Sequence, residues 1–250
     1  MARRGEITPF TIAPPFAGKG VWIWYLSGAE GGNLDAIAEK ALAHGVSWVA
    51  VKCADGAMPW GQFHEALGLK ERGLKLYSWG YNYGGDAEDI PVVTALQFGS
   101  DGHIFDIESE FAHLPDAPLR ATELLAKVLN ACPEANLAYA PLPVIDNFPG
   151  LPYETFNGRG LLVLPQFYTK ALGTGVEYTL ERLMAIWQEW TERWQDKPFC
   201  VYPVLQAYGA QTPENLRREG SVCMERYGGF SVWRWGDELT NDTWEAIRDA

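Results

Sequence analysis

The chain is poor in residues that bind metals or form cross-links. Its 250 residues include only four histidines and four cysteines. None of them falls in a C-x-x-C, H-x-H or H-E-x-x-H pattern, so neither a zinc site nor a redox pair is indicated. We therefore expect no metal ion and no cofactor. We expect free thiols, with a disulfide left open, at Cys53, Cys132, Cys200 and Cys223.

Positive charge and long apolar runs are also scarce. Lys and Arg number 20 against 32 Asp and Glu, which gives a net charge of -12. Non-specific nucleic-acid binding needs clustered Lys and Arg, so we expect no nucleic-acid partner. No segment approaches the roughly 18 apolar residues of a membrane span, so we expect no membrane insertion.

The beginning of the chain lacks the features of a Sec signal peptide. Residues 1–4 are basic, but residues 5–20 are interrupted by prolines and contain no continuous apolar core. The location of the protein stays open on this basis. We expect a monomer that remains in the cytoplasm until it is released or exported by another route.

Aromatic residues, by contrast, are abundant, with 11 Trp, 11 Tyr and 11 Phe. Flat aromatic faces suit sugar rings, but a large hydrophobic core uses the same residues. The composition therefore allows a carbohydrate site without identifying one.

Short apolar runs alternate with helical patterns along the whole chain. The expected strands are 20–26, 46–53, 74–79, 103–108, 136–141, 161–168, 199–206 and 230–235. The expected helices are 33–44, 60–72, 86–98, 117–131, 144–157, 178–195, 213–226 and 240–249. Eight such repeats predict a single (β/α)8 TIM barrel of the α/β class. We expect an N-terminal extension at 1–19 and the catalytic barrel at 20–250; an open doubly wound sheet is the main alternative.

In such barrels the active site lies at the C-terminal ends of the strands, so the residues at these ends are the predicted site residues. They carry carboxylates, aromatic rings and amides but few cations, which suits a neutral, hydroxyl-rich ligand such as a glycan. The substrate-binding residues that we expect from these ends are Trp24, Ser78, Tyr81, Tyr139, Gln166, Gln206 and Trp233.

Two carboxylates, Asp106 and Glu108, end the fourth expected strand. Strand side chains alternate, so both point to the same face, roughly 7 Å apart. Neighbouring carboxylates raise each other's pKa, and such a pair can divide acid and base roles. The alternative is a solvated or salt-bridged pair, for which Lys52 is a possible partner.

The fourth strand resembles a motif of glycoside hydrolase family 18, the chitinase and endo-N-acetylglucosaminidase group. That family carries D-G-x-D-x-D-x-E, and four of its five fixed positions are matched by Asp101, Gly102, Asp106 and Glu108, with Ile104 at the remaining one. Four shorter segments are also similar to the small plant-type chitinases of this family. They are the loop 28–31, the fifth-strand segment 137–141, the sixth-strand Q-F-Y at 166–168 and the eighth-strand segment 228–233.

The resemblance implies a retaining hydrolase of β-1,4 links next to an N-acetylated amino sugar, in a chitin- or peptidoglycan-like glycan. It implies that Glu108 is the acid, that the acetamide of the substrate is the nucleophile, and that Asp106 orients the acetamide. It also implies that Tyr168 donates a hydrogen bond to the acetamide and that Trp233 forms the floor of the site. We expect a raised pKa for Glu108 and a lowered one for Asp106.

Two alternatives remain open. The second strand, with Lys52 and Asp55, and the Asp106-x-Glu108 pattern are also similar to the family 25 lysozymes, which would make the protein a muramidase. The isoleucine at position 104 also leaves open a catalytically inactive barrel that binds carbohydrate or serves as a scaffold.

Overall fold

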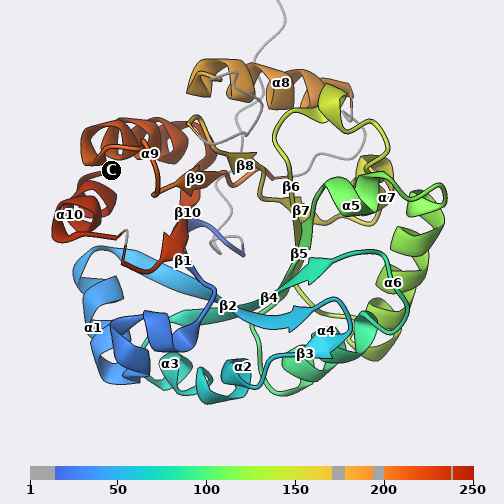
Figure 1. Cartoon of the computed structure of the whole chain (residues 1–250), viewed down its shortest axis with the longest axis horizontal. Coiled ribbons are helices and arrows are strands. Elements are labelled where there is room, and N and C mark those ends of the chain that lie inside the picture. The colour runs from blue at the N-terminus through green and yellow to red at the C-terminus, as the bar shows by residue number, and fades with distance from the viewer. Residues whose placement is uncertain (1–14, 171–177, 194–199, 238) are drawn as a thin grey trace, which may run out of the picture.

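The protein folds as a parallel β-barrel surrounded by helices (Figure 1). The computed structural model describes residues 15–170, 178–193, 200–237 and 239–250. The strands are β1 (Gly18–Ile23), β2 (Val46–Asp55), β3 (Met58–Pro59), β4 (Lys75–Asn82), β5 (His103–Ile107), β6 (Leu137–Pro141), β7 (Leu162–Val163), β8 (Gln166–Phe167), β9 (Val204–Gln206) and β10 (Gly229–Trp235).

Helices follow the strands and form the outer ring (Figure 1). The α-helices are α1 (Leu34–Ala43), α2 (Gln62–Glu65), α3 (Gly68–Glu71), α4 (Asp89–Gln97), α5 (Ser109–Ala112), α6 (Ala117–Ala131), α7 (Tyr153–Gly158), α8 (Leu180–Arg193), α9 (Pro213–Tyr227) and α10 (Asn241–Asp249). Short 3-10 turns are η1 (Leu26–Gly28), η2 (Glu30–Gly32) and η3 (Ile145–Asn147).

The strands follow one another around the barrel in chain order. Hydrogen bonding runs β7-β6-β5-β4-β2-β1-β10-β9-β8, and β3 pairs only with the end of β2 as a hairpin. The two ends of this path, β7 and β8, are consecutive parts of one segment interrupted at Pro165, which has no N–H for the ladder. Val163 of β7 also bridges to Val201, so the circle closes. The predicted (β/α)8 barrel is thereby confirmed.

The elements differ from the sequence prediction mainly where proline or glycine interrupts them. The helix expected at 60–72 is two short helices, α2 and α3, and the helix expected at 144–157 is η3 followed by α7. The hairpin strand β3 and the short helix α5 were not predicted. β1 begins at Gly18, two residues before the expected boundary, and residues 1–14 of the expected extension lie outside the described residues.

Side chains fill the barrel in alternation along each strand. Ile104 and twelve other buried side chains, including several Trp and Tyr rings, form the interior cluster. The neighbouring positions on the same strands pack against the surrounding helices in a second, larger cluster. Phe16 closes the N-terminal end of the barrel, where its ring stacks on Tyr77 at 4.0 Å between centroids.

Trp48 fits inside the barrel only because residue 20 is glycine. A β-carbon on Gly20 would lie 2.1 Å from Cε2 of the Trp48 indole. Replacing Gly20 by alanine should therefore lower the free energy of unfolding by about 3 kcal/mol or more. Urea denaturation followed by tryptophan fluorescence measures this change. Gly61→Ala is the matched control, because a β-carbon there meets no atom within 4 Å; equal midpoints for both variants would contradict the packing argument.

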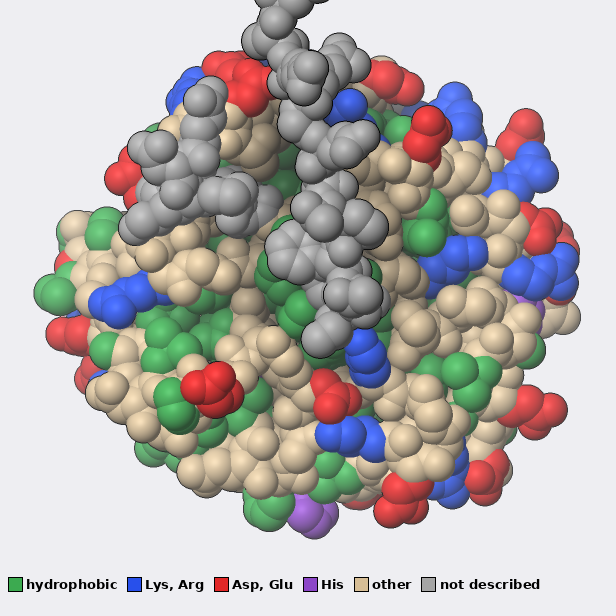
Figure 2. Space-filling model, turned by 180° about the vertical axis from the view of Figure 1, so that it is seen from behind, with side chains coloured by type: hydrophobic (Ala, Val, Ile, Leu, Met, Phe, Trp, Pro, Cys, Tyr) green, Lys and Arg blue, Asp and Glu red, His purple; other side chains and the backbone are tan. Residues whose placement is uncertain are grey.

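The surface carries mixed charge. On the face seen in Figure 2, Lys and Arg side chains are interspersed with Asp and Glu around the periphery, and hydrophobic side chains are visible nearer the middle. Among the helices in the described part of the chain, none is both long and apolar enough to cross a bilayer.

Candidate active site

The carboxylate pair lies at the C-terminal mouth of the barrel, as predicted. Ile104 and Asp106 belong to the face of β5 that points inward, and Glu108 follows on the same face directly after the strand. In the register of the sheet, Asp106 lies beside Tyr81 of β4 on one side and Ala140 of β6 on the other. It is only 5 % exposed.

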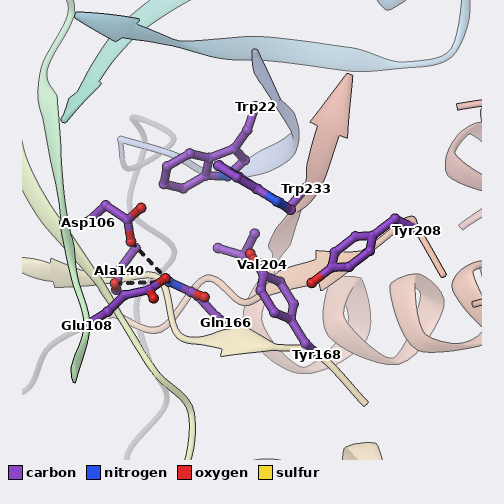
Figure 3. Close-up of a pocket in the computed structure, with 9 residues that line it drawn as sticks. All are labelled: Trp22, Asp106, Glu108, Ala140, Gln166, Tyr168, Val204, Tyr208 and Trp233. Carbon is purple, nitrogen blue, oxygen red and sulfur yellow. Dashed lines mark hydrogen bonds between the residues drawn. The ribbon is translucent and has the colours of Figure 1, made fainter. Parts of the chain in front are cut away.

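The amide of Gln166 connects the two carboxylates. Its Nε2 donates to Oδ1 of Asp106 and to Oε1 of Glu108, both at 3.0 Å. Figure 3 shows the Gln166 side chain next to both carboxylates. Gln166 belongs to β8, the continuation of the β7 segment that is separated from β5 by β6, and it is itself buried, so the barrel wall sets its position. One side chain thus holds both acidic groups in one orientation.

A cavity of about 140 Å³ opens beside this pair. The carboxylates and Gln166 line one side, and aromatic rings line the other, with Trp22 and Trp233 adjacent and the rings of Tyr168 and Tyr208 facing them (Figure 3). Because a water molecule occupies about 30 Å³ of liquid, this volume holds a group of a few heavy atoms. The lining residues are Trp22, Asp106, Glu108, Ala140, Gln166, Tyr168, Val204, Tyr208 and Trp233.

A second, wider cavity of about 340 Å³ shares Asp106, Glu108 and Trp233 with the first. It extends toward the ends of β1, β2 and β4. Its other lining residues are Trp24, Lys52, Asp55, Trp79, Tyr81, Tyr83 and Glu110. The two cavities together form one cleft, and the carboxylate pair stands where they meet.

The buried lysine of the cleft does not neutralise this pair. Lys52 is 2 % exposed, and its Nζ lies 2.8 Å from Oδ2 of Asp55. Its ammonium group also lies over the rings of Trp24, Trp60 and Trp79, at 4.4 to 5.1 Å from their centroids. Lys52 therefore forms its ion pair with Asp55, and not with Asp106 or Glu108 as the salt-bridge alternative required.

Both members of the pair have raised pKa values. Burial raises the pKa of Asp106 well above its ordinary value, and the neighbouring Glu108 raises it further. Burial also raises the pKa of Glu108, partly offset by the hydrogen bond from Gln166. The expectation of a lowered pKa for Asp106 was wrong, because the low-dielectric interior around Ile104 outweighs the attraction of the more distant Lys52. The two groups titrate as a coupled pair.

The raised pKa of Asp106 predicts an unusual pH dependence of stability. The folded protein holds this proton more strongly than the unfolded chain, so the free energy of unfolding falls as pH rises from about 4 through the folded pKa. Asp106→Asn removes the titration, and each pKa unit corresponds to about 1.4 kcal/mol. The variant should therefore gain stability relative to wild type at pH 7 and not at pH 4. Urea denaturation of both proteins at pH 4 and pH 7 tests this. If the variant and wild type differed in free energy of unfolding by the same amount at both pH values, the prediction would be contradicted.

Most of the predicted site residues line the cleft. Gln166, Tyr168 and Trp233 border the smaller cavity, and Trp24 and Tyr81 border the larger one. Burial and the nearby Asp106 carboxyl raise the pKa of Tyr168 well above its ordinary value, so its hydroxyl stays a hydrogen-bond donor at neutral pH.

Three predicted substrate-binding residues lie elsewhere. Ser78 points to the outer face of β4, where its Oγ is 2.9 Å from Nδ1 of buried His103. Tyr139 also points outward and donates to Oδ1 of Asn157 at 2.7 Å. Gln206 is fully buried, and its amide bonds the backbone of residues 170 and 208. For the first two, strand alternation turns the side chain to the outer face of the barrel.

Other cleft residues were absent from the predicted set. Trp22 lies on the inward face of β1, two positions before Trp24, which follows the strand, and its Nε1 donates to Ser231 Oγ at 3.0 Å. Trp79 and Tyr83 line the larger cavity. The strand alternation that gives Asp106 and Glu108 a common face would have identified Trp22 and Trp79 as well.

Within the described residues, no group of three or more His, Cys, Asp or Glu side chains could hold a metal ion.

Comparison with known proteins agrees with the fold. No family model and no curated protein matches this sequence. Among solved structures, the chain is similar to an endo-1,4-β-mannanase from Rhizomucor miehei, with 12% identity, a TM-score of 0.67 and coverage of 96% of this chain and 95% of that chain. A hyperthermostable endo-1,4-β-D-mannanase from Thermotoga petrophila gives 10% identity, a TM-score of 0.64 and coverage of 94% and 99%.

A candidate chitinase A from Streptomyces coelicolor gives 16% identity, a TM-score of 0.62 and coverage of 93% of this chain and 97% of that chain. At these identities the similarity concerns the barrel fold, and the substrate is not transferred with it. The protein is therefore a (β/α)8 barrel with a carboxylate pair at its mouth, and the barrel fold is what it has in common with these mannanase and chitinase structures.

Proposed function

We propose that this protein is a glycoside hydrolase that cleaves β-1,4 links next to an N-acetylated amino sugar, with Glu108 as the acid. The supporting observation is the setting of Glu108. Its carboxyl group borders both cavities of the cleft and makes no ion pair with any described residue, while burial raises its pKa. A carboxyl that stays protonated to higher pH than a solvated glutamate and borders the open cleft can give its proton to a leaving oxygen.

The smaller cavity supports an N-acetyl group at the cleaved sugar. Its volume of about 140 Å³ suits an acetamido group, with polar groups on one side and the rings of Trp22 and Trp233 on the other. In this proposal Asp106 accepts a hydrogen bond from the acetamide N–H, and the hydroxyl of Tyr168 donates one to the acetamide oxygen. The sugar ring itself would occupy the meeting point with the larger cavity.

The chemistry then runs in two steps. Glu108 protonates the glycosidic oxygen while the acetamide oxygen attacks the anomeric carbon, so the glycosidic bond breaks and a cyclic oxazolinium ion forms. Asp106, as a carboxylate or as a hydrogen-bond acceptor, stabilises its charged N–H. Water next attacks the anomeric carbon and gives its proton to Glu108, which restores the acetamide and retains the configuration.

The test is hydrolysis of a panel of glycans by the purified chain. N-acetylglucosamine oligomers and peptidoglycan carry the N-acetyl group, and β-1,4-mannan oligomers lack it. Release of reducing ends from the acetylated glycans, and not from mannan, would support the proposal. Cleavage of mannan at a similar rate would contradict the acetamide mechanism. Binding of a glycan without cleavage would favour the carbohydrate-binding barrel instead.

A further inference from the structure

Exposed apolar side chains gather on one side of the cleft. Tyr25 is 54% exposed, Met58 68% and Tyr83 45%. They lie directly after β1, on β3 and directly after β4, and these strands neighbour β2 in the sheet. The ring of Trp60 packs beside Tyr25, with 5.3 Å between centroids. We call these four side chains the apolar rim.

The apolar rim continues from the cleft. Tyr83 lines the larger cavity, whose inner end is formed by Asp106 and Glu108. Tyr25 lies beside Trp24, another wall of that cavity, with ring planes 9° apart and centroids separated by 6.0 Å. An unbroken path of aromatic side chains therefore leads from the carboxylate pair to the surface.

Tyr83 is held in place before any ligand arrives. Its hydroxyl donates to Oδ1 of Asp55 at 2.8 Å, and its backbone N–H donates to Oε1 of Glu88 at 3.0 Å. A β-carbon on Gly56 would lie 3.1 Å from the ring, so glycine at this position lets the hairpin approach it closely. A ring fixed in this way loses little conformational entropy when a ligand stacks on it.

We propose that the apolar rim binds further sugar residues of the same glycan, beyond the residue held at Glu108. This inference rests on the proposed function and specifies how the substrate lies. The cavity on the rim side is about 340 Å³, whereas the cavity that reaches Tyr168 and Tyr208 is about 140 Å³. The glycan therefore extends mainly over the ends of β1, β2 and β4, and the enzyme prefers long oligomers to short ones.

Carboxylates next to the rim favour a sugar over a wholly apolar partner. Asp55 and the exposed Glu110 stand beside Tyr83 and Tyr81, whose hydroxyl donates to Glu110 Oε2 at 2.5 Å. The aromatic rings suit the C–H face of a pyranose ring, and the carboxylates and hydroxyls beside them can bind the sugar hydroxyls at its edge.

The experiment compares kcat/KM on a short and a long N-acetylglucosamine oligomer. In a Tyr25→Ala, Tyr83→Ala double variant, the preference for the long oligomer should fall about tenfold. Phe98→Ala is the matched control, because Phe98 is also 54% exposed but caps the end of α4, where the chain turns back toward the start of β5. The control should keep the wild-type preference.

Calorimetry measures the affinity for the long oligomer without any need for turnover. It compares the Glu108→Gln protein with the same protein that also carries Tyr25→Ala and Tyr83→Ala. Weaker binding without the tyrosines supports the rim even if no glycan is cleaved, in which case only the proposed hydrolysis fails. An unchanged length preference in an active enzyme overturns the inference and leaves the hydrolase proposal standing. Self-association that depends on the tyrosines, with glycan binding unaffected, also overturns it.

Discussion

Glu108→Gln is expected to lower kcat on an N-acetylglucosamine oligomer by about 10²–10⁴-fold, the usual contribution of a general acid. Glutamine keeps nearly the same shape but has no proton of suitable acidity to give to the leaving oxygen. Burial raises the pKa of the Glu108 carboxyl, so the wild-type group stays protonated to higher pH than a solvated glutamate. Steady-state kinetics measure the loss, and calorimetry should show that the oligomer still binds.

Glu110→Gln provides the matched control two residues away. Glu110 is exposed, and the hydrogen bond from Tyr81 lowers its pKa, so it is ionised and cannot serve as the acid at neutral pH. We expect this variant to lose less than about tenfold in kcat. If the two variants lost activity equally, the assignment of Glu108 as the acid would be wrong.

Removing the N-acetyl groups from the substrate is expected to lower the rate by at least about a thousandfold with the unmodified enzyme. In the proposed mechanism the acetamide oxygen is the nucleophile, and a well-placed internal nucleophile has an effective molarity of about 10⁵ M or more. A free amine at the same carbon offers no such oxygen. Kinetics on acetylated and de-acetylated oligomers of equal length measure the difference.

A thiazoline mimic of the oxazolinium ion separates this mechanism from direct attack by a carboxylate. It should bind far more tightly than the sugar, because it resembles the charged intermediate and not the ground state. If Asp106 attacked the sugar itself, the de-acetylated oligomer would be cleaved at a comparable rate and the thiazoline would show no advantage. That result would move the protein toward the lysozyme-like alternative.

The barrel was predictable from local pattern. Eight apolar runs separated by helical segments are visible in the chain, and each run corresponds to a barrel strand or to a strand divided by proline. The location of Asp106 and Glu108 at the mouth follows from their place at the end of a strand. Local sequence sufficed here because strand and helix periodicities are properties of short segments.

The orientation of side chains at the mouth was only partly predictable. Ser78 and Tyr139 stand near strand ends, but their side chains point to the outer face of the barrel, where Ser78 meets His103 and Tyr139 meets Asn157. The side chain of Trp22 points to the inside of the barrel and lines the cleft. The face to which a side chain points depends on the register in which its strand pairs with its neighbours. A register shift of one residue moves every side chain of the strand to the other face.

The sequence by itself determined the fold class, the carboxylate pair and the end of the barrel at which it lies, because these depend on local periodicity and strand order. Only the tertiary structure decided that Gln166 bridges the two carboxylates, that Lys52 pairs with Asp55, and that burial raises the pKa of Asp106. The hydrogen bonds of Gln166 and the burial of Asp106 involve strands far apart in the chain, which only closure of the barrel brings together. Lys52 and Asp55 stand three residues apart on β2, but only the folded structure decides that the ammonium group binds this carboxylate and not the pair on β5.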